Sequence, residues 1–136
     1  MDNKLNAFLH PVAVEDQEII ISKRFVENGE PIPFRIRAIT QEESEELTKK
    51  CTTYTKDRSG NAKRNFDTIK FSRALVATGT VFPDFSSKEL CDAYGVIDPM
   101  LVAPKMLLAG EYNKLADAIA ELSGLNEEDV EEEAKN

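Results

Sequence analysis

The side chains best suited to chemistry in this 136-residue chain are one histidine and two cysteines. Cys51 and Cys91 lie far apart in sequence, and neither has a second cysteine or a histidine nearby to build a tetrahedral zinc site. Spacing alone leaves a disulfide open, but no apolar export signal follows Met1, which favours a reducing compartment. His10 precedes Pro11, and a general base would need a partner that the sequence does not provide. We therefore predict two buried free thiols and no catalytic histidine.

Carboxylates are numerous, with 25 acidic side chains in all. Pairs such as Asp84 and Asp98 are therefore expected by chance and indicate no glycosidase-like role. The six glycines match neither a dinucleotide-binding nor a Walker spacing, and no nucleophile elbow, zinc-binding helix or calcium loop is present. We predict no catalytic, cofactor-binding or metal-binding residues and no cofactor. The chain is expected to act by binding rather than as an enzyme.

Charge is distributed unevenly along the chain. The formal net charge is −8, yet residues 49–73 carry a net charge of +6. Such a segment can neutralise phosphates, but the overall acidity and the lack of an interleaved aromatic series argue against nucleic acid. We favour a solvated basic surface or loop, one that could meet an acidic protein surface. A small regulator that contacts nucleic acid through residues 49–73 stays as the alternative. The basic side chains are Lys49, Lys50, Lys56, Arg58, Lys63, Arg64, Lys70 and Arg73.

The N-terminal part of the chain predicts β-structure. Residues 16–26 include a β-branched run that suits a strand. Asn28-Gly29 tolerates the positive φ of a tight turn, and Phe34 and Ile36 then alternate with arginines. We predict a β-hairpin, or two strands of a small antiparallel sheet. Two strands alone are marginal in water, so helices must cover their apolar face.

The rest of the chain predicts helices. Thr40 and Glu43 match a capping box that starts a helix with the apolar positions Leu47, Cys51 and Tyr54. Residues 55–65 are polar and predict an exposed loop. Further helices are expected to start at Asp67, at Ser86 or Ser87, and at Asp98-Pro99. Residues 81–85 predict an apolar turn.

These elements predict an α+β fold in which an N-terminal two-stranded antiparallel β-hairpin packs on a predominantly helical domain. We expect a single domain over residues 1–124. Residues 125–136 contain six acidic side chains and little to bury, which predicts an acidic C-terminal tail that is frayed or disordered. Docking to a basic partner, masking of the basic segment and a purely solubilising role are the alternatives for this tail. No stretch is apolar enough to span a membrane.

A succession of short segments resembles a known family, the XkdN-like tail assembly chaperones of contractile-tailed phages and prophages. No single motif is decisive, but the order of the segments is the same over residues 15–124, and the acidic ending is shared. The segments are Ile21–Phe25, Gly29–Phe34, Arg37–Glu43, Phe82–Phe85, Tyr94–Val96, Asp98-Pro99 and Met106–Tyr112.

The resemblance implies a non-enzymatic helper made in the host cell. Such proteins are thought to bind the tape measure protein, keep it soluble and help recruit tail tube subunits. The resemblance places the chain in the host cytoplasm and not in the mature virion. Self-association is left open as a further contact, and a minor structural tail component is the other alternative. The family brings no catalytic residues to transfer.

A helper of this kind needs an exposed apolar surface for an apolar-striped helix. Our candidate partner-binding residues are Tyr112, Leu115, Ile119 and Leu122, which are spaced along one face of the last helix. The alternative is that this stripe faces the protein's own core.

Overall fold

Polar side chains start most of the longer helices. The structure is a computed structural model, and it describes residues 4–125. Thr40 forms the predicted capping box with Glu43, and Asp67 accepts a hydrogen bond of 3.0 Å from the amide of Lys70. Ser87 and Asp98 cap the next two starts, as predicted. The helices are α1 (Leu5–Leu9), α2 (Gln41–Lys50), α3 (Thr68–Gly79), α4 (Lys88–Ala93), the short 3₁₀ turn η1 (Pro99–Leu101), α5 (Val102–Met106) and α6 (Ala109–Leu122).

The main sheet has three short antiparallel strands. They are β1 (Gln17–Ile19), β4 (Phe34–Ile36) and β7 (Thr80–Phe82), in the order β1-β4-β7. In β4, Phe34 and Ile36 are buried and Arg35 is exposed, so one face of the sheet packs on the helices. Two further short strands, β2 (Val26–Glu27) and β3 (Glu30–Pro31), pair across the predicted Asn28-Gly29 turn.

The predicted α+β class is confirmed, whereas the specific two-stranded hairpin is not confirmed. β1 and β4 pair antiparallel, as expected for two strands of a small antiparallel sheet, but the sheet has a third strand. β4 pairs on its second edge with β7, in a segment that we expected to be an apolar turn. The first strand is also shorter than the predicted 16–26. The physical reason is that β7 meets β4 only after more than 40 intervening residues fold back, and no local pattern reports such a contact.

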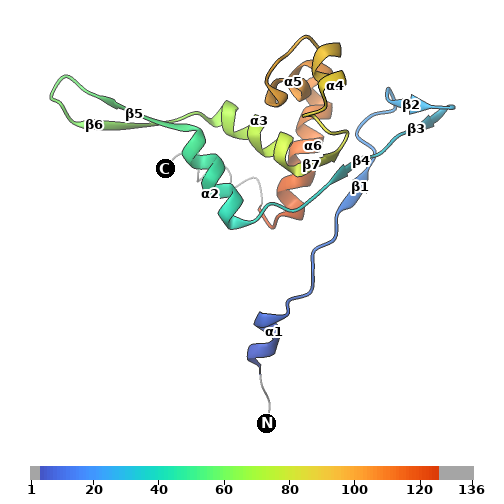
Figure 1. Cartoon of the computed structure of the whole chain (residues 1–136), viewed down its shortest axis with the longest axis horizontal. Coiled ribbons are helices and arrows are strands. Elements are labelled where there is room, and N and C mark those ends of the chain that lie inside the picture. Colours follow the sequence, from blue (N-terminus) through green and yellow to red (C-terminus); the bar gives the residue numbers. More distant parts are fainter. Residues whose placement is uncertain (1–3, 126–136) are drawn as a thin grey trace.

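The predicted loop over residues 55–65 is wrong. The structure has a second antiparallel hairpin there, formed by β5 (Thr52–Lys56) and β6 (Ala62–Phe66), with Thr52 opposite Phe66. The Asp57 carboxylate accepts hydrogen bonds from the amides of Ser59 and Asn61, which closes the turn. This hairpin projects from the helical body (Figure 1). The preceding helix α2 accordingly ends at Lys50, and Tyr54 lies on a strand rather than on the helix.

The core lies between the sheet and helices α3, α5 and α6. Its most completely buried aliphatic side chains include Ile36, Val76, Val102, Leu115 and Ile119. Cys51 and Cys91 are buried free thiols, as predicted, and burial raises the pKa of the Cys51 thiol.

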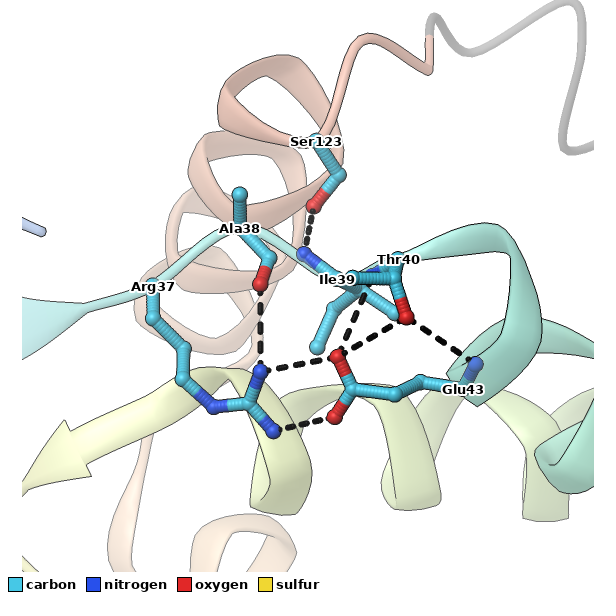
Figure 2. A network of polar contacts seen from close by, with 6 residues as sticks. All are labelled: Arg37, Ala38, Ile39, Thr40, Glu43 and Ser123. Atoms are coloured by element: carbon cyan, nitrogen blue, oxygen red, sulfur yellow. Dashed lines mark hydrogen bonds and ion pairs between the residues drawn. The ribbon is translucent and has the colours of Figure 1, made fainter. Parts of the chain in front are cut away.

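A polar network joins the sheet, the start of α2 and the end of α6 (Figure 2). The Arg37 guanidinium donates two hydrogen bonds to the Glu43 carboxylate, which also accepts from the amide of Thr40. The hydroxyl of Ser123 accepts a hydrogen bond of 2.8 Å from the amide of Ile39. The end of the last helix is thereby held beside the start of α2.

The N-terminal arm, residues 5–14, extends away from this body (Figure 1). None of the residues of α1 is buried. The predicted acidic tail, apart from Leu125, lies outside the described residues.

Candidate partner-binding groove

An open groove of about 470 Å³ lies between α3 and α6. Its walls come from the first two turns of both helices, and the segment around α5 also lines it. The lining residues are Thr68, Ile69, Ser72, Arg73, Pro104, Leu107, Ala109, Tyr112 and Asn113.

The wall on α3 is set by the cap at Asp67. This cap fixes the first turn of the helix, in which Ile69 points outward and is 63% exposed. Arg73 follows one turn later on the same side of α3 and places a cation at the rim. The first two turns of α3 therefore offer an apolar contact next to a positive charge.

The wall on α6 is formed by Tyr112. Its ring is half-buried, and its hydroxyl lies 2.9 Å from the hydroxyl of Ser72 on α3. Burial raises the pKa of the Tyr112 phenol. This bond ties the two walls together, so the groove keeps its width.

A second, more polar hollow of about 410 Å³ shares Ile69 and Arg73 with the groove. Lys70 and Asp98 line it. The outer side of α3 therefore carries the exposed apolar side chain of Ile69 beside the charged side chains of Lys70 and Arg73.

The structure separates the four predicted partner-binding residues. Tyr112 lines the groove, whereas Leu115 and Ile119 are fully buried in the core and Leu122 is partly buried against it. In the folded chain a partner can touch Tyr112, but it reaches Leu115 and Ile119 only if α6 leaves the core. Binding by the stripe as a whole stays a prediction, and its accessible part is Tyr112.

Sequence reasoning missed Ile69 and Arg73 as groove residues. The helix after Asp67 carries apolar side chains on more than one face, a pattern typical of a central helix rather than of a binding surface. Ile69 is the available signal, because it lies off the face that carries the buried Phe71 and Leu75.

His10, Asp84 and Asp98, which were considered for chemistry, are either exposed or engaged in local backbone hydrogen bonds. His10 is exposed at the end of α1, and Asp84 accepts hydrogen bonds from the amide and hydroxyl of Ser86. Asp98 caps η1.

A smaller, almost wholly apolar cavity of about 210 Å³ opens beside the sheet. Phe25, Phe34 and Tyr94 line it, and Phe82 at the edge strand is half exposed.

Among residues 4–125, no helix is both long enough and apolar enough to cross a membrane.

Open apolar grooves with charged rims are typical of proteins that bind another polypeptide. Comparison with known proteins narrows this class, because the family model described as phage XkdN-like tail assembly chaperone protein matches residues 5–135. This chain belongs to that family.

Two relatives come from Bacillus subtilis (strain 168). The phage-like element PBSX protein XkdN is 37% identical over 129 residues, which is 92% of this chain and 87% of that protein. The uncharacterized protein YqbN is 38% identical over 129 residues, with the same shares. The crystal structure of the protein YqbN matches with a TM-score of 0.77 and 32% identity, covering 93% of this chain and 98% of that one.

Proposed function

We propose that this protein is a tail assembly chaperone that binds the tape measure protein, keeps it soluble and helps recruit tail tube subunits without catalysing a reaction. The observation that carries the proposal is the apolar groove between α3 and α6 in a member of this family. The alternative of a minor structural tail component predicts the protein in purified particles. Our proposal places it in the host cytoplasm and not in the virion.

The groove suits a helix with an apolar stripe. A helix docks through side chains spaced three or four residues apart, and Ile69 and Tyr112 offer apolar contacts on facing walls. Covering an exposed isoleucine contributes about 1.5–3 kcal/mol, so a few such contacts give binding that still allows release. Arg73 at the rim favours a client with a carboxylate beside its stripe.

The test is co-expression with the tape measure protein, with the soluble client measured after affinity capture. We expect I69S to lower the captured amount at least several-fold, because the substitution places a hydroxyl in the apolar wall. The matched control is I97S, since Ile97 is 99% exposed and lies outside the groove. Equal capture by the wild type and I69S would refute the groove as the binding site.

Self-association is a second contact that we propose, and it uses the N-terminal arm. Leu5, Phe8 and Leu9 follow the spacing of one face of the short helix α1, and all three are at least 60% exposed. Such a stripe is stable when another surface covers it. The arm of one copy would pack on a neighbouring copy.

The alternative role in nucleic-acid binding rests on residues 49–73. Affinity for duplex DNA that falls steeply with salt would support it.

A further inference from the structure

Within residues 4–125, the hairpin of β5 and β6 pairs with no further strand. Nearly all of its residues are exposed along both strands, and only its base is partly covered. At the base, the Phe66 ring packs 5.4 Å from that of Phe71. A two-stranded sheet with both faces in water is marginal by itself, so its stability favours a partner along its length.

Positive charge gathers on this hairpin and beside it. Tyr54 and Arg64 are paired across the strands, so an exposed aromatic ring and a cation share one face. Lys63 lies next to Arg64, and Lys70 of α3 reaches back to the carbonyl of Lys50. Within residues 4–125, the basic segment makes one ion pair, a loose contact of 3.8 Å between Lys49 and Glu46. The charge of the hairpin is therefore left unbalanced by the described part of the chain.

We propose that the occupant of this basic hairpin is the chain's own acidic segment, residues 126–136, which binds along it and masks it in the free protein. This segment contains six carboxylates and one lysine, opposite in sign to the net charge of +6 on residues 49–73. The inference goes beyond the proposed function, because it concerns a second surface and requires no client.

The place where the described chain ends supports the assignment. The hydroxyl of Ser123 accepts a hydrogen bond from the amide of Ile39, so the end of α6 lies beside the beginning of α2 (Figure 2). The ten residues of α2 span about 15 Å, and each five-residue strand of the hairpin spans about 17 Å. Eleven residues reach at most about 36–40 Å when extended. The segment is long enough to follow α2 and reach the hairpin.

The energetics suit a reversible contact. Each exposed ion pair contributes less than about 1 kcal/mol, but several form together. Tethering also gives a short linked segment an effective concentration of about millimolar. The contact weakens with salt, and an acidic partner surface competes with the segment for the same cations.

The first test measures proximity. A nitroxide is attached to the full chain through N136C, where the new thiol is selective because Cys51 and Cys91 are buried. We expect amide signals of the hairpin to lose most of their intensity, while those of the β2–β3 turn, at another end of the molecule (Figure 1), keep theirs. The signals recover in about 1 M NaCl, where the Debye length falls to about 3 Å.

Two matched variants define the charge requirement. E131Q/E132Q/E133Q should remove the broadening, whereas E18Q/E27Q/E30Q, which neutralises three carboxylates near the sheet, should leave it unchanged. Unaffected hairpin signals in the labelled wild type would overturn the proposal. Broadening that appears in a mixture of labelled and isotope-enriched chains would overturn it too, because the segment would then occupy a neighbouring copy.

The second test measures masking with heparin as the anionic probe. We expect E131Q/E132Q/E133Q to elute at higher salt than the wild type and than E18Q/E27Q/E30Q. Adding K63E/R64E should abolish this shift, whereas K88E/K105E should retain it. An unchanged elution salt would count against masking. Neither test uses the tape measure protein. A negative result would therefore overturn masking by the acidic segment without deciding whether the groove binds the client, which the I69S capture experiment tests.

Discussion

Gly79, the last residue of α3, lies directly against Ile119 of α6. A Cβ atom added at Gly79 would stand 2.5 Å from Cγ2 of Ile119, which is closer than real Cβ contacts come. The two helices that form the groove therefore approach each other through a missing side chain. Their separation at this point depends on glycine.

Replacing Gly79 with alanine should destabilise the protein. Because Ile119 is fully buried, it has no free space into which to move. We expect G79A to lower the free energy of unfolding by about 1–3 kcal/mol, measured by urea denaturation. The control is G110A, at a helical position with nothing within 4 Å of the added carbon. It should be neutral or stabilising by up to about 1 kcal/mol. Equal stability of the two variants would show that α3 and α6 can separate at little cost.

Alanine at Leu115 should unfold or strongly destabilise the domain. Leu115 is fully buried, and truncation of such a leucine costs about 2–5 kcal/mol. Thermal melting of L115A and Y112A separates the two roles within the predicted stripe. Y112A should lose less stability and should reduce tape measure capture. If L115A were instead stable but failed to capture the tape measure protein, Leu115 would be assigned to the binding surface.

Stability should fall in acid through two ion pairs. Hydrogen bonds from the Arg37 guanidinium hold the pKa of Glu43 at about 2, and those from Arg24 hold the pKa of Glu111 at about 2. Both values lie below the ordinary 4.5. The stabilisation is therefore complete above about pH 5 and is lost as the pH falls toward 2.

The Glu43 pair can be tested separately. E43Q should cost about 1 kcal/mol near neutral pH, since it removes a partly exposed ion pair, whereas glutamine can still accept the hydrogen bond from the amide of Thr40 in the capping box. It should also flatten the fall in stability between about pH 5 and 2. E42Q, which alters the adjacent exposed carboxylate, should keep the wild-type profile. A steep acid loss in E43Q would assign the effect to other groups.

Removal of the N-terminal arm should change association more than folding. Because α1 contributes no buried residue, deletion of residues 1–14 should alter the free energy of unfolding by less than about 1 kcal/mol. Light scattering at increasing concentration should show that the wild type associates and that the shortened chain does not. The double variant L5S/F8S tests the same contact in the full-length chain.

Sequence reasoning succeeded where the signal is local. The capping side chains of Thr40, Asp67 and Asp98 act on amides two or three residues away, so their spacing alone located the helix starts. The turn at Asn28-Gly29 was predictable for the same reason.

Sequence reasoning failed where contacts between segments far apart in the chain determine the structure. The strands of the basic hairpin are exposed on both faces, so they lack the alternation that marks a half-buried strand and resemble a loop. The stripe on α6 showed that one face is apolar, but not which surface covers it. Leu115 meets the core, whereas Tyr112 reaches the groove.

The arm and the basic hairpin extend from the body in different directions (Figure 1). Such outgrowths raise friction with the solvent far more than they raise mass. A sphere-like domain of this length has a radius of gyration of about 14 Å, and this molecule should exceed it. It should therefore leave a gel-filtration column ahead of compact standards of 15.2 kDa even as a single chain. Early elution alone would be a false sign of a dimer.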